Sequence, residues 1–247
     1  MSDAAQAEWE QRRTSFGSAA EHYQAGRPSY PREVLLRCLP DGANDVLDLA
    51  AGTGALTAGL LDVGLAVVAV EPLDAMRRLI PAEAHALAGT AEDIPLPDES
   101  VDAVFIGQAW HWFDAPRAVA EIPRDLRPGG VLAPMWSLLD ADDPVSLALA
   151  EVAAHDECST NMLGDEAQPP FDPAGLFTPP ERLIVSYALP YNRDRVAALI
   201  SSVSATINAT PEDKVKIIDT ATSAVPDGDF FLSWICEAWR SEKITAK

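Results

Sequence analysis

Five apolar runs that follow one another through the first half of the chain limit the folds available to it. They have the length and composition of buried strands, at 45–50, 65–70, 85–89, 101–106 and 130–136. Amphipathic runs with helical periodicity lie between or beside them, at 55–63, 73–80 and 115–126. Strands that alternate with helices predict a parallel sheet with helices on both faces.

The second half of the chain is less regular but offers the parts that would complete this sheet. Two further strands are expected at 181–190 and 230–239, with helical segments around 193–204 and 211–222. We therefore predict an α/β fold with a Rossmann-like, mostly parallel sheet of seven strands, in which the last strand is antiparallel. Pro123 stands inside the helix expected at 115–126 and predicts a kink or a break there.

Charge and composition exclude several classes of partner. The chain of 247 residues carries a formal net charge of −20. Nucleic acids and anionic membranes are bound through clustered Lys and Arg, so neither is an expected partner. The N-terminus lacks the apolar segment of a signal peptide, and Asp62 and Gly64 interrupt the longest apolar run. We expect a cytoplasmic protein.

The cysteines and histidines give no sign of a metal site. Cys38, Cys158 and Cys236 are too widely spaced to suggest a disulfide framework or a zinc knuckle. The run His155–Cys158 contains metal-binding residue types, but consecutive residues of a helix point in different directions. No metal is expected.

The turn that follows the first strand is the candidate ligand site. In "VLDLAAGTG", residues 46–54, Gly52 and Gly54 permit a tight turn and let a ligand approach the backbone. Asp48 precedes them in the strand, and Glu71 closes the next strand. Because a carboxylate has two acceptor oxygens, Glu71 is suited to the two hydroxyls of a ribose.

Three ligands fit a loop of this kind to different degrees. A nucleoside triphosphate needs a Lys after the second glycine, where Ala55 stands, so it is excluded. A dinucleotide needs a third small residue where Thr57 stands, and it remains a weak alternative. S-adenosylmethionine carries a ribose and an amino acid without phosphate, and Asp48 and Glu71 suit its hydroxyls and ammonium group.

At these positions the sequence resembles the class I S-adenosylmethionine-dependent methyltransferases. "VLDLAAGTG" is similar to the first motif of that family, "VAVEP" to the second, and "GTAEDIPLPDESVDAVFIGQAWHWF" to the third and fourth. The resemblance implies Glu71 at the ribose and the segment around Thr90 at the adenine. It implies that S-adenosylmethionine is bound and S-adenosylhomocysteine is released. The implied cofactor-binding residues of these motifs are Asp48, Ala50, Gly52, Gly54, Glu71, Pro72, Thr90, Ala91 and Glu92.

The N-terminal stretch "FGSAAEHYQAGRPSYP" resembles a subgroup of small-molecule enzymes that includes relatives of trans-aconitate methyltransferase. In that subgroup a segment ahead of the sheet folds over the cofactor, which implies Tyr23 and Arg27 near its methionyl end. An arginine also has the forked donors that a carboxylate accepts.

Residues 108–112, after the fourth predicted strand, are the candidate substrate contacts. Gln108 is expected at the cofactor or the substrate. His111 is the candidate general base, because imidazoles titrate near neutral pH. Trp110 and Trp112 either line a substrate pocket or belong to the core. The Asn/Asp-Pro-Pro-aromatic motif of methyltransferases that act on DNA bases does not follow this strand. A small-molecule acceptor is therefore expected.

These expectations divide one methyltransferase domain, 1–247, into four parts: an N-terminal helical cap (1–40), a cofactor-binding core (41–136), a lid or substrate insertion (137–180) and a segment that completes the sheet (181–247).

Two other functions stay open. One is a non-catalytic module that binds S-adenosylmethionine or S-adenosylhomocysteine as a regulator, and the other is an NAD-dependent oxidoreductase on the same sheet. The methyl acceptor and the oligomeric state have no sequence signal.

Overall fold

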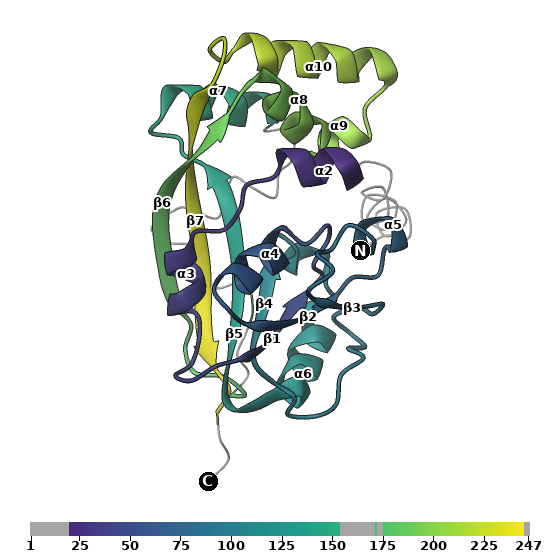
Figure 1. The fold of residues 1–247 in the computed structure, drawn as a ribbon, viewed down its shortest axis with the longest axis vertical. Helices are drawn as coiled ribbons and strands as arrows, with labels where there is room; N and C mark the ends of the chain where they lie inside the picture. The colour runs from purple at the N-terminus through teal and green to yellow at the C-terminus, as the bar shows by residue number, and fades with distance from the viewer. Residues whose placement is uncertain (1–19, 154–170, 172–174, 245–247) are drawn as a thin grey trace. The chain divides into compact units, whose positions relative to one another are not determined.

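A single seven-stranded sheet runs through the protein, with the strand order β3-β2-β1-β4-β5-β7-β6 (Figure 1). The computed structural model describes residues 20–153, 171 and 175–244. The strands are β1 (Asp45–Leu49), β2 (Ala66–Val70), β3 (His85–Leu87), β4 (Val101–Gly107), β5 (Leu126–Leu139), β6 (Glu181–Tyr191) and β7 (Phe230–Glu242). The predicted fold class and all seven predicted strands are confirmed.

The first five strands are parallel, and β1 lies between β2 and β4. Leu47 is opposite Val68 on one side and Val104 on the other. Leu47 and Val104 are fully buried. Because helices cover both faces of such a sheet, its central strands are mostly apolar, and this is why they could be recognised in the sequence.

Strand β7 runs antiparallel to β5. Near one end the Lys243 amide donates to Gly130 O, and near the other the Asp140 amide donates to Ser233 O, so the two chains pass in opposite directions. The sheet is therefore mixed, with β7 as the reversed strand, as predicted.

Strand β5 begins earlier than predicted because it contains an irregularity. Leu126 pairs with Val101, but the next partner, Val131, pairs with Ala103, so extra residues bulge out between them. Gly129 has a φ of 76° in this bulge, a backbone conformation that glycine adopts without strain. The residues around Gly129 therefore interrupt the pairing inside the strand, and the strand itself begins at Leu126.

A helix is present in each of the five segments where one was expected, 55–63, 73–80, 115–126, 193–204 and 211–222, and four of these five end earlier than expected. They are α2 (Ala20–Gly26), α3 (Arg32–Arg37), α4 (Ala55–Asp62), α5 (Asp74–Arg77), the 3₁₀ helix η2 (Trp110–Trp112), α6 (Ala115–Asp125), α7 (Pro144–Ala153), α8 (Arg193–Ser201), α9 (Ser204–Ile207) and α10 (Pro211–Ser223). The break expected at Pro123 does not occur. Helix α6 continues through it and ends two residues later, so the proline occupies the last turn.

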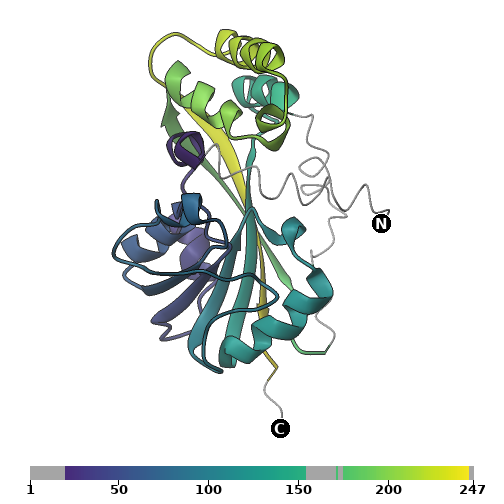
Figure 2. The ribbon, with the colours of Figure 1, turned by 90° about the vertical axis from the view of Figure 1, so that its right-hand side faces the viewer.

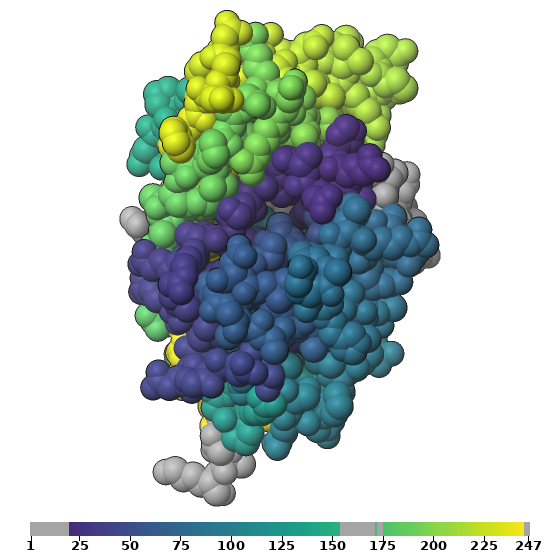
Figure 3. Space-filling view, in the orientation of Figure 1, coloured from purple at the N-terminus to yellow at the C-terminus, as the bar shows by residue number. Residues whose placement is uncertain are grey.

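The chain forms two compact units by its internal contacts. Unit 1 comprises 1–28, 138–161 and 186–234, and unit 2 comprises 29–137, 162–185 and 235–247. In unit 2, α4 lies on one face of the sheet and α6 on the other (Figure 2). Helices α3 and α4 lie side by side on the face drawn in Figure 3.

Unit 1 holds most of its helices around a buried cluster. Its members are Leu149, Tyr191, Val196, Leu199, Ile200, Ala221, Val225, Leu232 and Trp234. Across the parts of the chain that the structure describes, no helix has the length and apolar character needed to span a membrane.

Helix α2, which carries Tyr23 and ends one residue before Arg27, packs against α8. A Cβ on Gly26 would lie 2.2 Å from the Leu199 backbone nitrogen, so only glycine fits there. The Tyr191 hydroxyl donates to Gly26 O at 2.8 Å and fixes the end of the helix. The cap helix is thus part of the packing of unit 1.

This close approach predicts that Gly26→Ala destabilises the protein by about 2 kcal/mol, because the added methyl group overlaps with backbone that cannot rotate away. Free energies of unfolding in urea measure the effect. Gly59→Ala in α4 is the matched control, since its new Cβ meets only the Leu35 Cδ1 methyl, at 3.0 Å. Equal stability of the two variants would contradict the packing described here.

Candidate functional site

The candidate site lies at the carboxyl ends of β1, β2 and β4, where the strand order changes direction. From β1 the chain passes to β2 on one side, whereas β4 pairs with β1 on the other side. Ligands of open α/β sheets bind at such switch points. All residues that the sequence motifs place at the cofactor belong to unit 2, apart from Tyr23 and Arg27.

The loop after β1 has an unusual backbone with three residues in the left-handed region. Ala50, Gly52 and Gly54 have φ values of 60°, 58° and 86°. Glycine adopts this region without a steric penalty, whereas Ala50 is strained there. A Cβ on Gly54 would lie 2.6 Å from Pro81 Cδ, so the loop also needs glycine for packing.

Glu71 connects this loop to the end of β2. Its Oε2 accepts the Gly52 amide at 2.9 Å, and its Oε1 accepts the Leu73 amide at 2.8 Å. Burial raises the pKa of Glu71, and the two amides counteract this. A carboxylate has about four acceptor positions, so two of them stay available for the hydroxyls of a ribose.

Arg77 fixes the turn that carries Glu71. Its guanidinium donates to Glu71 O at 2.8 Å and to Pro72 O at 3.2 Å, and it pairs with Asp74. The side chain of Pro72 is exposed. Arg77 was not among the predicted site residues, because its spacing from Glu71 forms no recognisable motif.

Asp48 is fully enclosed beneath the loop. Its Oδ2 accepts the Thr57 hydroxyl at 2.6 Å, whereas Oδ1 has no hydrogen-bond partner. Burial raises the pKa of Asp48 to about 7, and the hydrogen bonds from Thr57 oppose this shift. A buried acceptor without a partner is costly. Asp48 Oδ1 is therefore suited to accept a hydrogen bond from a polar group of a ligand.

The segment after β3 forms a small turn beside the site. The Thr90 amide donates to Asp93 O, and the Asp93 amide donates back to Thr90 O. Ala91 is buried within this turn. The Glu92 carboxylate accepts the Asp114 amide at 2.9 Å and so ties the turn to the start of α6.

Gln108 ends β4 in a strained conformation with a φ of 57°. Its amide donates to Met135 O at 2.9 Å, and its side chain donates to Ser137 O at 2.6 Å. Just before it, a Cβ on Gly107 would lie 2.5 Å from the Tyr30 hydroxyl. Tyr30 therefore borders the end of β4. It belongs to the N-terminal stretch 16–31, in which only Tyr23 and Arg27 were predicted as site residues.

The residues of η2 differ in their surroundings. Trp110 is buried, with its ring 5.7 Å from Phe113 and 5.4 Å from Phe171, and thus has the contacts of a core residue. His111 is exposed, and its ring lies 4.7 Å from that of the half-buried Trp112.

Tyr23 and Arg27, the expected cap residues, contact each other and α8 within unit 1. The Arg27 guanidinium lies 4.6 Å from the centre of the Tyr23 ring. It donates to Ser202 Oγ and to Ser202 O, both at 3.0 Å. The first 19 residues of the cap lie outside the described residues, and so do residues 154–170 and 172–174 of the expected insertion, which include His155–Cys158.

Comparisons with known proteins agree with this geometry. The profile of the "Methyltransferase domain" family matches residues 47–133. An uncharacterized methyltransferase of Mycobacterium tuberculosis is 41% identical over 209 residues, which cover 83% of this chain and 83% of that protein. A malonyl-[acyl-carrier protein] O-methyltransferase of Methylococcus capsulatus is 36% identical over 135 residues, 48% of each chain.

A solved structure proposed to be a type II methyltransferase, from Anaeromyxobacter dehalogenans, shares the fold with a TM-score of 0.65. It is 22% identical and covers 89% of this chain and 99% of its own. The fold is that of the Rossmann-like methyltransferases. The chain belongs to the class I S-adenosylmethionine-dependent methyltransferases.

The raised pKa of Asp48 predicts a specific pH dependence of stability. Its unfolded value is about 3.9, so between about pH 4 and 7 the folded state binds a proton that the unfolded state does not. This group therefore lowers stability as the pH rises from about 4 to about 7. Asp48→Asn removes the effect, so its stability relative to wild type should increase over that window and level off above it.

Urea unfolding at pH 5, 6, 7 and 8 tests this expectation, and Asp102→Asn is the control. Burial alone would raise the pKa of Asp102, but hydrogen bonds from Asn44, Arg127 and Asp45 lower it below its usual value. The control should therefore be less stable than wild type throughout this range. A pH-independent difference between Asp48→Asn and wild type would contradict the assignment.

Proposed function

We propose that the protein transfers the methyl group of S-adenosylmethionine to a small-molecule acceptor by in-line displacement. The observation that carries the proposal is the buried Glu71 carboxylate, which holds the Gly52 amide and retains acceptor capacity for a ribose. The unpartnered Asp48 oxygen and the left-handed backbone of Gly52 and Gly54 support it.

The proposed contacts follow the order of the strands. Glu71, followed by Pro72, holds the ribose, and Asp48 and the loop from Ala50 to Gly54 serve the amino-acid end. Thr90, Ala91 and Glu92 border the adenine, and Gln108 lies toward the transferred methyl group. Tyr23 and Arg27 of the cap contribute to the methionyl end, as the resemblance to relatives of trans-aconitate methyltransferase implies.

When bound, S-adenosylmethionine supplies an electrophilic methyl carbon on a sulfonium. The work of the protein in such a displacement is to align the acceptor with that carbon and to keep water away. Gln108, Trp110, His111 and Trp112 are the residues that we assign to the acceptor, because they follow β4.

A small acid is the acceptor class that we favour. The net charge of −20 disfavours nucleic acids as substrates. The Methylococcus relative is named as a malonyl-[acyl-carrier protein] O-methyltransferase, and a malonyl group ends in a carboxylate. A carboxylate is also already a nucleophile at neutral pH, so it needs no base. Carboxylic acids therefore come first in an acceptor screen, ahead of phenols and amines.

The first test of the site is Glu71→Gln. Gln presents an NH₂ group where one acceptor oxygen stood, which removes a charge-assisted hydrogen bond worth about 1.5–3 kcal/mol. We expect the dissociation constant of S-adenosylhomocysteine, measured by calorimetry, to rise about 10- to 100-fold. Glu83→Gln, an exposed glutamate, is the control and should bind as wild type does. Unchanged binding in Glu71→Gln would contradict the proposed ribose contact, and a wild-type preference for NAD would favour the oxidoreductase.

His111 is proposed as the base for acceptors that must lose a proton. His111→Asn should lower kcat/KM for a phenol or amine by at least about 100-fold, the usual lower range for general-base catalysis. With a carboxylic acid, which needs no base, the same variant should lose much less activity, because only the contact of His111 with the acceptor changes. An equal loss with both classes would show that His111 binds the acceptor and is not a base. Binding of the cofactor without turnover of any acceptor would instead favour a regulatory module.

A further inference from the structure

Helix α6 holds the segment that connects β3 to β4 along its whole length. This segment, residues 88–100, has almost no regular secondary structure of its own. At the start of α6 the Asp114 amide donates to Glu92, and at its end Arg124 O and Asp125 O accept the amides of Glu99 and Ser100. The conformation of the segment therefore depends on contacts with the helix.

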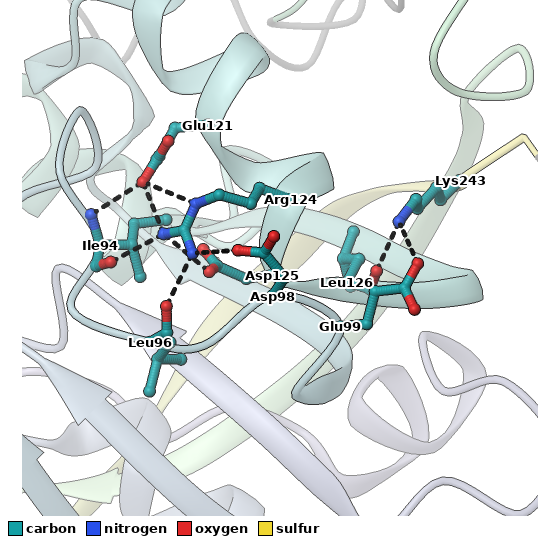
Figure 4. Close-up of polar contacts among 9 residues, drawn as sticks. All are labelled: Ile94, Leu96, Asp98, Glu99, Glu121, Arg124, Asp125, Leu126 and Lys243. Carbon is teal, nitrogen blue, oxygen red and sulfur yellow. Dashed lines mark hydrogen bonds and ion pairs between the residues drawn. The ribbon is translucent and has the colours of Figure 1, made fainter.

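Arg124 provides most of the contacts between these two ends (Figure 4). Its Nη2 donates to Ile94 O at 2.8 Å, and its Nη1 donates to Leu96 O at 2.7 Å and to Asp98 Oδ1 at 3.0 Å. Two backbone carbonyls of an irregular loop are thus bound by one planar guanidinium. A lysine has no rigid fork and could not reproduce this geometry.

Glu121 completes the arrangement one helical turn earlier. Its Oε1 accepts Arg124 Nη2 at 2.7 Å and Nε at 3.2 Å, and it also accepts the Ile94 amide at 3.3 Å. The peptide groups on both sides of Ile94 are therefore fixed by this one pair of side chains. Asp125, fully buried, lies 2.9 Å from Arg124, and burial raises the pKa of its carboxyl group to about 7.

The loop held in this way is the continuation of the turn proposed to border the adenine. Thr90 and Ala91 precede Ile94 by only a few residues, and the Ile94 side chain is buried. A displacement of Ile94 would thus be passed directly to that turn.

We propose that Arg124 and Glu121 are positioning residues for base recognition: by fixing the backbone of Ile94 and Leu96, they hold the turn at Thr90–Glu92 in the shape that selects adenine. The inference rests on the proposed function, because it takes the adenine contact of that turn from it. It adds two residues that touch neither the cofactor nor the acceptor.

The test compares S-adenosylhomocysteine with S-inosylhomocysteine, which differ only in the base. The ratio of their dissociation constants in wild type and in Arg124→Met, measured by calorimetry, reports recognition of the base itself. We expect Arg124→Met to weaken the adenosyl ligand about tenfold, to affect the inosyl ligand less, and so to reduce the ratio. Arg124→Lys should not restore it. A merely structural role would weaken both ligands equally.

Arg127→Met is the matched control, because Arg127 also forms two ion pairs, with Asp45 and Asp102, but does not contact the segment. Its ratio should equal that of wild type. Should Arg124→Met fail to fold, Glu121→Gln tests the same contacts with a milder change. A wild-type ratio in the folded Arg124 or Glu121 variant would overturn the inference while the proposed function stands. If wild type binds both ligands with equal affinity, the proposed adenine contact and this inference are both wrong. If wild type binds neither ligand, the proposed function is wrong.

Discussion

The hydrogen bond from the Gly52 amide to Glu71 is the contact on which the candidate site depends. It joins the loop after β1 to the end of β2, so the two parts that would enclose a ribose are set by one carboxylate. Burial makes this arrangement expensive, as the raised pKa of Glu71 indicates. Asp48, which precedes Gly52 in the chain, is also buried, and burial raises its pKa as well. Buried carboxylates with a raised pKa are enriched at functional sites.

Both backbone conformation and side-chain contacts hold the loops around this hydrogen bond in place. Left-handed conformations at Gly52 and Gly54 turn the chain, and α4 begins directly after them. Arg77 binds the carbonyls beside Glu71, and Arg124 binds those of the segment after β3. Two arginines thus stabilise irregular loops at two neighbouring strand ends. Each guanidinium is bound by both carboxylates and backbone carbonyl groups.

The strands could be predicted because burial on both faces makes them continuous apolar runs that end at turn residues. The carboxylates could be predicted because Asp48 and Glu71 have a fixed place relative to a strand end. The partners of these carboxylates could not be predicted. The contact of Thr57 with Asp48 depends on how α4 packs, and the sequence showed only that Thr57 stands where a dinucleotide loop needs a third small residue. The contacts of Arg124 could not be predicted either, because the carbonyl groups that it binds are about 30 residues earlier in the chain. The bulge in β5 was also hidden, because its glycines are equally typical of a turn before the strand.

The most direct measurement is a crystal structure of the protein grown with S-adenosylhomocysteine. The account predicts both ribose hydroxyls on the Glu71 carboxylate, the Gly52 and Leu73 amides still bound to the same side chain, and the adenine against Ala91. A ligand bound elsewhere, or one whose ribose does not contact Glu71, would contradict it.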